Sequence, residues 1–508
     1  MHVGHPMTLR MTPPSSQTYT QILKSTMLMG GASLVNVALS IIRNKAMAVL
    51  LGPEGIGLMG LYNSIVDIAQ SIAGLGVGGS GVRQVAEAAG TGDAARIAQS
   101  ATVLRRISVV LALLGALFLA ALAYPVSGFT FGDYQHVGGI VLLSLAVFFR
   151  LVSAGQSALI QGMRGIADLA RISVLAGLFG TAVSIPLIYL FGVQAVAPSL
   201  VVVAASSILP TWWYSRRIFP KPSPMSARQF AREVSALLRL GFVFMASGLL
   251  TFGAAYAIRL IVLKEGGVIA AGLYQAAWGL GGLYAGFILQ AMGTDFYPRL
   301  TAAADNHPEC NRLVNEQAEI SMLLAGPGLL GTLTLAPLMM SLFYSAEFHG
   351  AVDLLRWICL GMMLRIISWP MGFIVVAKRT QAIFFWTEVA AAVVHVGLAW
   401  LLVPLLGTQG AGMAFFGLYV WHSILIYVIV RKLTGFRWSA ANRRHALLFL
   451  PASALVFLMF AILPLWPATA IGFVAVILCG LYSLRMLIDL LPPESIPAII
   501  RGWITKSA

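Results

Sequence analysis

Arg150-Leu151-Val152-Ser153 decides the fold of this chain, because the pattern returns 215 residues later as Arg365-Ile366-Ile367-Ser368. The same shift relates other segments in the same order, and a shift of 216 relates two further arginine pairs. These matches are Arg164 with Arg379, Gly192-Val193-Gln194 with Gly407-Thr408-Gln409, Arg216-Arg217 with Arg431-Lys432, Arg43 with Arg259, and Arg83 with Arg299. An ordered series of this kind predicts two copies of one unit, and duplicated halves of membrane proteins commonly enclose a transport site.

The composition predicts an integral membrane protein. Hydrophobic residues make up 59% of the 508 residues and charged residues only 10%, whereas about a quarter of the residues in a soluble domain are charged. Apolar runs of about 20 residues can each cross a hydrocarbon core of about 30 Å. Such spans must satisfy their own backbone hydrogen bonds, so the expected fold is all-α. The 14 expected spans are residues 25–51, 56–82, 103–126, 138–162, 172–191, 195–215, 241–264, 270–296, 318–345, 353–377, 383–406, 412–430, 447–465 and 469–491.

The charged residues predict the orientation of the chain and exclude other partners. The net charge is +15, with 33 Lys and Arg. If both termini lie inside the cell, most of these residues fall in inner loops, tails or inner helix ends, as the positive-inside rule requires. The charge therefore indicates topology and no nucleic-acid partner. Cys310, Cys359 and Cys479 are too far apart for a metal site, so we expect neither a metal nor a cofactor. No outer loop is long enough for a catalytic domain, so we expect no enzyme.

The glycine-rich stretch Gly52-Pro53-Glu54-Gly55-Ile56-Gly57 allows two interpretations. It could be a phosphate-binding loop or a tight turn at the outer ends of two spans. A phosphate-binding loop follows a strand and opens a helix, and the surrounding sequence has no such pattern. We therefore favour the turn.

The duplication predicts the organisation of the chain. Two six-helix lobes are expected at residues 25–219 and 241–432, related by a pseudo-twofold axis along the membrane normal, because each copy has an even number of spans. Residues 220–240 form a basic cytoplasmic linker, and its amphipathic part is expected to lie at the membrane interface or to serve a regulatory site. Residues 433–491 add two spans outside the duplication. Residues 1–24 and 492–508 are expected to be cytoplasmic tails.

Four arginines are expected well inside the spans, where one charge costs roughly 2.5–3.5 kcal/mol at a helix centre. A wet vestibule with several guanidinium groups suits a multiply charged anion, since Arg binds phosphate through two parallel N–H bonds. In the alternative, the arginines pair with the buried acids Asp67 and Glu388 and only lock helices together. The candidate anion-binding residues are Arg43, Arg150, Arg259 and Arg365, and polar residues at helical spacing beside them are Asn36, Ser40, Asp67, Ser153, Ser157, Gln161 and Ser368.

Titratable residues in the second copy suggest an ion-coupling role. Glu388 and His395 are seven residues apart and share a helix face, and the first copy lacks them. A histidine titrates near neutral pH, so the pair could carry coupling protons. In the alternative, Glu388 locks an arginine and His395 is a core residue. His422 has a weaker claim to either role. Arg356 is expected to extend to the membrane interface.

The chain resembles the multidrug/oligosaccharidyl-lipid/polysaccharide exporter superfamily, and within it the O-antigen and lipid III flippases of Gram-negative bacteria. The resemblance covers residues 20–432 and rests on the stretch Leu50–Leu58, on Arg356-Trp357, and on the stretch from Lys378 to Thr387-Glu388-Val389. Drug-exporting relatives use an acidic site in the first span, where this chain has Asn36 and Arg43 instead. This difference argues against a cationic drug as substrate.

The resemblance implies that the chain moves an undecaprenyl-pyrophosphate-linked oligosaccharide from the inner to the outer leaflet of the bacterial inner membrane. The partners it implies are this substrate, membrane lipids, and glycan polymerase or assembly proteins. An ion-coupled drug or metabolite antiporter is the second interpretation, and a membrane glycosyltransferase is a third with almost no support. The two last spans either border the gap between the lobes and guide the lipid tail, or pack peripherally.

Overall fold

The computed structural model describes residues 16–218, 225–291, 296–378 and 380–490. All regular structure in these residues is helical, which confirms the all-α expectation. Residues 1–15 of the expected N-terminal tail, residues 220–224 of the expected linker and the whole expected C-terminal tail lie outside the described residues.

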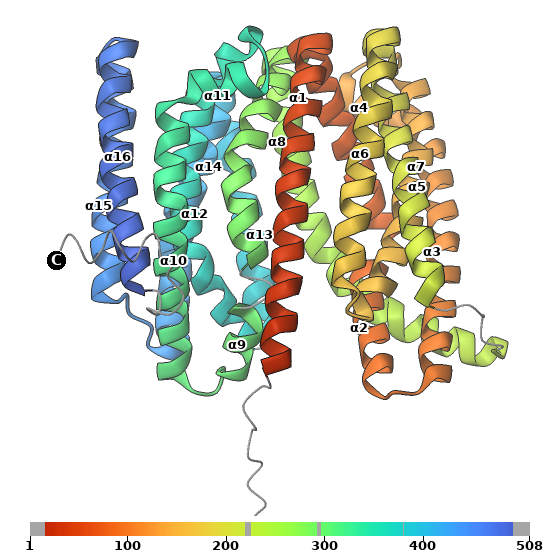
Figure 1. Cartoon of the computed structure of the whole chain (residues 1–508). Coiled ribbons are helices and arrows are strands. Elements are labelled where there is room, and N and C mark those ends of the chain that lie inside the picture. Colours follow the sequence, from red (N-terminus) through yellow and green to blue (C-terminus); the bar gives the residue numbers. More distant parts are fainter. Residues whose placement is uncertain (1–15, 219–224, 292–295, 379, 491–508) are drawn as a thin grey trace, which may run out of the picture.

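In the N-terminal half, α5 is the central helix. It packs against α3 on one side and α7 on the other, and α6 lies between α1 and α7 (Figure 1). The elements are α1 Ser16–Ala73, α2 Val77–Gly90, α3 Ala94–Ala121, α4 Ala123–Phe131, α5 Val137–Gly162, α6 Ile166–Phe191, the 3-10 turn Gly192–Ala195, and α7 Val196–Ile218.

The C-terminal half repeats this order of neighbours. Here α12 packs against α10 and α14, and α13 lies between α8 and α14. The elements are α8 Ala227–Ala291, α9 Tyr297–Ala302, α10 His307–Thr334, α11 Ala336–Phe343, the 3-10 turn Ala346–Ala351, α12 Val352–Ala377, α13 Gln381–Leu406, α14 Thr408–Thr434, α15 Ala440–Ile462 and α16 Leu465–Leu490.

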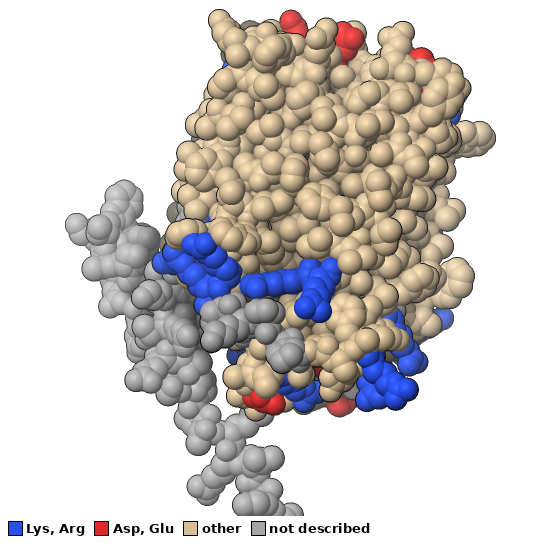
Figure 2. Space-filling model, turned by 90° about the vertical axis from the view of Figure 1, so that its right-hand side faces the viewer, with Lys and Arg blue, Asp and Glu red and all other residues tan. Residues whose placement is uncertain are grey.

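The described residues contain 10 helical segments long and apolar enough to cross a membrane. Three of them, at residues 35–73, 166–217 and 227–283, each cover two of the spans expected from the sequence. In addition, α10 and α11 together form one broken span with a bend of 85°. The face in Figure 2 carries a broad band without charged residues, with Lys and Arg gathered toward its lower end. The chain is therefore a multi-pass membrane protein.

Single glycines interrupt α1 and α8 at matching positions. Gly52 has φ 63° and ψ −171°, and Gly267 has φ 73° and ψ −175°. Glycine adopts a positive φ without the steric cost that a Cβ adds. The glycine-rich stretch is thus a kink at the end of two spans, and the turn interpretation is confirmed. The two kinks are 215 residues apart, so Arg259 corresponds to Asn44. The match of Arg43 with Arg259 was wrong by one residue.

The two halves touch through backbone where α1 and α8 bend. A Cβ at Gly57 would lie 2.2 Å from the carbonyl oxygen of Val268, and a Cβ at Gly272 would lie 1.8 Å from that of Pro53. Beside this contact, Lys45 of α1 donates to the carbonyl oxygen of Ser341 at 2.6 Å and to that of Tyr344, at the end of α11. The contact is reciprocal, since Gly57 and Gly272 occupy the same position in the two copies.

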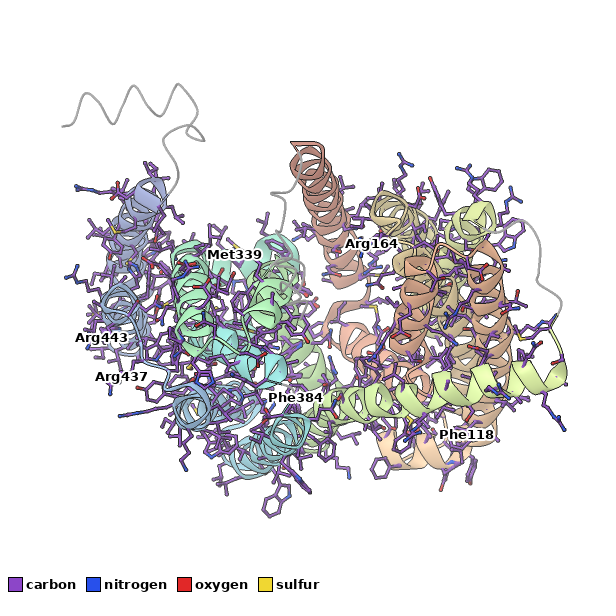
Figure 3. All side chains as sticks on the ribbon, turned by 90° about the horizontal axis from the view of Figure 1, so that it is seen from below. Phe118, Arg164, Met339, Phe384, Arg437 and Arg443 are labelled. Carbon is purple, nitrogen blue, oxygen red and sulfur yellow. The ribbon has the colours of Figure 1, made fainter. Side chains whose placement is uncertain are left out.

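The beginning of α8 is an amphipathic helix that runs across the underside of the N-terminal half (Figure 3). Val234, Leu237 and Leu238 pack into an apolar cluster with residues of α2, α3 and α5. Arg228 and Arg232 are exposed. This packing agrees with the interfacial interpretation of the linker, although α8 continues unbroken past the expected boundary at residue 240.

The pair α15 and α16 packs against α10, on the side that faces away from α1–α7 (Figure 1). A buried polar cluster fixes it there: His445 contacts Glu319 at 3.2 Å and Tyr482 at 3.0 Å, and Asn442 donates to Asn315 at 2.9 Å. The hypothesis that this pair borders the gap between the halves was therefore wrong. It lies outside the duplication, so the sequence repeat could not place it.

Arg356 also differs from its expected position. Its guanidinium lies 3.7 Å above the ring of Phe460 in α15 and pairs with Asp353 at 2.9 Å. Only 8% of the side chain is exposed. The expected extension to the interface was wrong, because α15 covers this face of α12.

Candidate functional site

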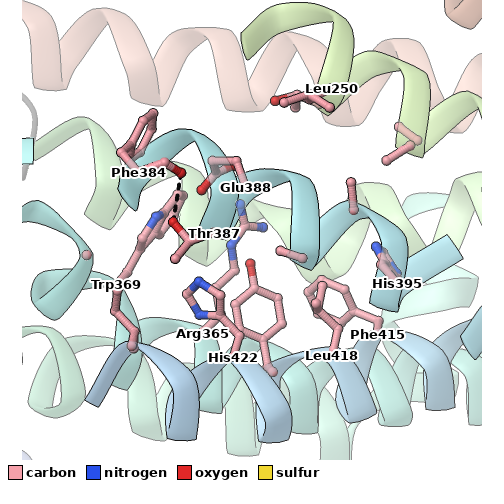
Figure 4. Close-up of a pocket in the computed structure, with 18 of the residues that line it drawn as sticks. Leu250, Arg365, Trp369, Phe384, Thr387, Glu388, His395, Phe415, Leu418 and His422 are labelled. Atoms are coloured by element: carbon pink, nitrogen blue, oxygen red, sulfur yellow. Dashed lines mark hydrogen bonds between the residues drawn. The ribbon is translucent and has the colours of Figure 1, made fainter. Parts of the chain in front are cut away.

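A cavity of about 490 Å³ lies in the C-terminal half, between α8, α12, α13 and α14. Its lining is mostly apolar and aromatic, and one arginine, one glutamate and two histidines project from three helices. These are Arg365 on α12, Glu388 and His395 on α13, and His422 on α14 (Figure 4). We expected a vestibule between the halves, but this cavity lies mainly within one half. Its volume is typical of a small-molecule site.

Arg365 is held by aromatic rings instead of by an acid. Its guanidinium lies 4.2 Å from the ring centroid of Trp369 and 5.6 Å from that of Tyr419. A weak contact with the sulfur of Met362 is 4.0 Å long, the hydroxyl of Tyr419 also interacts with the guanidinium, and the buried Nε has no hydrogen-bond partner. Within the described residues no carboxylate lies within 4.0 Å of it. The rings fix the position of the cation, and its Nε–H is available to a further partner.

Glu388 faces the same part of the cavity as Arg365 (Figure 4), but no salt bridge of 4.0 Å or less joins the two side chains. Nε2 of His395 and Nδ1 of His422 are buried and have no hydrogen-bond partner within the described residues. Buried polar groups are normally hydrogen-bonded. Three unsatisfied polar groups around one cavity therefore indicate a site that is completed by a polar ligand or by water.

In the N-terminal copy, the equivalent residue Arg150 has other partners than Arg365. Arg150 donates to Asp67 at 2.7 Å and to Asn63 at 2.8 Å. The shift of 215 places Gly282 and Trp278 at these two positions in the second copy. Arg365 therefore lacks the carboxylate that neutralises Arg150. The helix-locking interpretation fits Arg150, and the anion-binding interpretation fits Arg365.

The other two candidate arginines do not line this cavity. Arg259 donates through Nε and Nη2 to Oε1 of Gln275, at 3.1 and 3.0 Å, which holds the two parts of α8 together across the kink. Arg43 is half-buried in α1. Neither forms an ion pair with a carboxylate in the part of the chain that the structure describes.

The polar residues expected beside the arginines do not gather at the cavity, and two of them form hydrogen bonds to neighbouring helices. Asn36 donates to Ser173 of α6 at 2.8 Å, and Ser153 bonds Ser207 of α7 at 3.0 Å. Ser368 is buried and donates to the carbonyl oxygen of Arg365 at 3.2 Å. Ser40 and Ser157 are half-buried and Gln161 is exposed. None of these six residues lines the cavity, so the structure does not bring them to Arg365.

A family model described as "Polysaccharide biosynthesis protein" matches residues 46–353, which is more than half of the chain. The chain belongs to this polysaccharide biosynthesis protein family. A lipid III flippase of Escherichia coli (strain K12) is 22% identical over 410 residues, which cover 78% of this chain and 95% of the relative. The resemblance stated from the sequence is thereby confirmed.

Solved structures show which fold this family member has. A lipid II flippase, MurJ, in an inward closed conformation matches with a TM-score of 0.64 at 12% identity, over 92% of this chain and all of that one. A multidrug resistance MATE family transporter of the MOP superfamily, in an inward-facing conformation, matches with a TM-score of 0.63 at 18% identity, over 79% of this chain and 98% of that one. The family member therefore has the fold of MOP-superfamily transporters.

Not all the residues that line the cavity of Arg365 were identified from the sequence. Trp369 and Tyr419 were not singled out, and His422 was given little weight. Trp369 is four residues after Arg365 and His422 is three residues after Tyr419, so each pair shares a helix face. That spacing was the signal that could have found them.

Proposed function

We propose that the protein is a flippase that moves an undecaprenyl-pyrophosphate-linked oligosaccharide of the O-antigen type from the inner to the outer leaflet of the bacterial inner membrane. The observation that carries the proposal is Arg365, a cavity-lining cation whose buried Nε–H has no partner and which forms no ion pair within 4.0 Å among the described residues. A pyrophosphate would satisfy this cation through two parallel hydrogen bonds. The similarity to a lipid III flippase supports the substrate class.

We also propose the topology expected from the sequence, with 14 spans in two six-helix lobes related by a pseudo-twofold axis. The matching order of helix neighbours and the reciprocal contact of Gly57 with Gly272 support this relation. The lobes comprise residues 25–219 and 241–432, joined by 220–240 and followed by 433–491. The concentration of basic residues at one end supports cytoplasmic termini.

Transport in this proposal proceeds by alternating access without any covalent step. The contact between the kinks of α1 and α8 closes the outer end in the described conformation. The headgroup reaches Arg365 from the inner side, and opening of the kink contact releases it outside. The polyprenyl tail stays in lipid, because it is too long for a cavity of about 490 Å³. Glycan polymerase and assembly proteins are the proposed partners.

Glu388 and His395 are the proposed ion-coupling pair. Both line the cavity of Arg365, and protonation of Glu388 removes the charge that competes with the pyrophosphate for the guanidinium. Glu388→Gln should therefore bind substrate but export it independently of the proton gradient. The measurement is glycan export with and without a protonophore, and Glu87→Gln is the control because that acid is exposed in α2 and does not line the cavity. A Glu388→Gln variant that stays fully sensitive to the protonophore would contradict the coupling role.

The alternative is an ion-coupled drug or metabolite antiporter of the same superfamily. The likeness to a multidrug transporter fold and the titratable cavity favour it. The two functions differ in what is lost when the gene is deleted. For a flippase, one surface glycan disappears and its lipid-linked precursor accumulates. An antiporter deletion instead leaves all surface glycans intact and alters drug or metabolite sensitivity.

A further inference from the structure

A second cationic pocket lies on the outside of the N-terminal half, far in sequence from the cavity of Arg365. It has a volume of about 210 Å³ and lies between α3, α5 and α7. Arg105 and Arg216 contribute the charge, and Trp212 forms one wall. Arg216 lies in the last turn of α7, and Arg105 of α3 reaches the carbonyl oxygen of Ser215 in the same turn.

The two arginines are positioned without an acid. Arg216 lies over the rings of Trp212 and Trp213, at 4.4 and 3.9 Å from their centroids. Arg105 uses one Nη2 bond to the carbonyl oxygen of Ser215, at 2.7 Å. No carboxylate of the described residues lies within 4.0 Å of either guanidinium. The remaining N–H groups are free for a further partner.

Two uncharged polar groups of the same pocket also lack partners. Ser108 is 5% exposed and its Oγ has no hydrogen bond, and the buried Oε1 of Gln156 has none either. An unpartnered hydroxyl and an unpartnered amide oxygen beside two cations are complementary to a polar ligand with both donors and acceptors. A headgroup of phosphate and glycerol hydroxyls has this chemistry.

The surface above the pocket is suited to acyl chains. On α3, Val109, Leu113 and Leu117 follow one another at four-residue spacing and are 41%, 50% and 67% exposed. Leu209 of α7 is also exposed, at 67%. Trp212 and Trp213 are about half exposed beside the arginines, as aromatic residues of the membrane interface are. A cationic pocket below an apolar ridge matches the shape of a lipid that lies against the protein.

We propose that this pocket binds an anionic phospholipid of the membrane leaflet at the Arg-rich end. Arg105 and Arg216 hold the phosphate, Gln156 and Ser108 contact the polar headgroup, and the ridge of α3 contacts the acyl chains. The bound lipid joins α3 to α7 across α5. This inference stands independently of the substrate proposed above, because no residue of the Arg365 cavity takes part.

The test is native mass spectrometry of the full-length protein with phosphatidylglycerol and phosphatidylcholine in equal amounts. The wild type should retain phosphatidylglycerol selectively, and Arg216→Ala should retain about tenfold less, because the charge-assisted hydrogen bonds of one guanidinium to the phosphate are lost. Arg216→Ala is the first variant because that guanidinium contacts only aromatic rings, so its loss leaves no buried partner. The double variant Arg105→Ala/Arg216→Ala should lose the selectivity.

The matched control is Arg228→Ala/Arg232→Ala, which removes the same charge from the exposed face of α8. It should bind phosphatidylglycerol as the wild type does. Equal loss of phosphatidylglycerol binding in both double variants would show a general attraction of the basic surface to anionic lipid, and it would overturn the proposal of a specific pocket. Unchanged binding in Arg216→Ala and the double variant would overturn it as well. Displacement of phosphatidylglycerol by equimolar undecaprenyl pyrophosphate would overturn the assignment to a phospholipid.

Discussion

Arg365→Ala is expected to reduce glycan export about 100-fold while the protein reaches the membrane at near-normal abundance. The guanidinium forms no ion pair within 4.0 Å among the described residues, so its removal breaks no salt bridge. Export falls because two hydrogen bonds to the pyrophosphate are lost, each contributing roughly 1.5–3 kcal/mol, and each 1.4 kcal/mol is about tenfold. Arg365→Lys should also impair export, because it keeps the charge and loses the planar pair of donors. Export is measured in a deletion strain and abundance by immunoblotting.

The equivalent arginine of the first copy provides the control. Arg150→Ala should lower the abundance, because Asp67 loses its ion-pair partner inside the membrane. The side chains of Arg150 and Asp67 are 30% and 35% exposed, so the loss is smaller than the 3–5 kcal/mol of a fully buried pair. Asp67→Asn in the same chain should restore part of the abundance. If the abundance of Arg365→Ala falls as that of Arg150→Ala does, Arg365 serves to hold helices together, and the anion-binding role is contradicted.

Gly272→Ala is expected to abolish export by separating the kinks of α1 and α8. Its Cβ would lie 1.8 Å from the carbonyl oxygen of Pro53, a backbone atom that cannot move alone. Overpacking of this kind costs roughly 1–3 kcal/mol, which shifts the equilibrium against the closed outer end by roughly 5- to 150-fold. Leu61→Cys reports the change, because Leu61 is fully buried between α1 and α8. A membrane-impermeant maleimide should label this cysteine from outside only when Gly272→Ala is also present.

The control for this substitution lies on the same helix. A Cβ at Gly253 would meet no atom within 4 Å, so Gly253→Ala should leave both export and labelling unchanged. The three native cysteines are buried and should give little background. Normal export by Gly272→Ala, with Leu61→Cys still protected, would show that the kink contact does not gate the outer end.

The sequence alone predicted the membrane class and the repeat, because both follow from local composition and from matching residues. It also contained the difference between Arg150 and Arg365. Applying the shift of 215 to Asp67 gives Gly282, which shows that the second copy lacks the acid. Choosing Asp67 for this comparison requires the knowledge that Arg150 contacts it. A contact between α5 and α1 depends on how the helices pack, and no local sequence pattern encodes it.

Helix packing also explains the other differences between the positions expected from the sequence and those in the structure. Asn36 and Ser153 have the spacing of a water-facing stripe, yet each bonds a serine on a neighbouring helix. Polar side chains in membrane helices serve both purposes, and spacing does not distinguish them. The position of α15 and α16 depends on bonds from Asn442 and His445 to Asn315 and Glu319 of α10, which lie more than 120 residues earlier in the chain.

The central claim is that the protein transfers a lipid-linked oligosaccharide between leaflets, and the sidedness of that lipid tests it most directly. Spheroplasts of the deletion strain, complemented with the wild type or with Arg365→Ala, are treated with a membrane-impermeant galactose oxidase or periodate reagent. The lipid-linked oligosaccharides are then extracted and the modified fraction is measured. The account predicts a modified fraction with the wild type and full protection of an accumulated precursor with Arg365→Ala. Equal modification in both strains and in the uncomplemented deletion would contradict it.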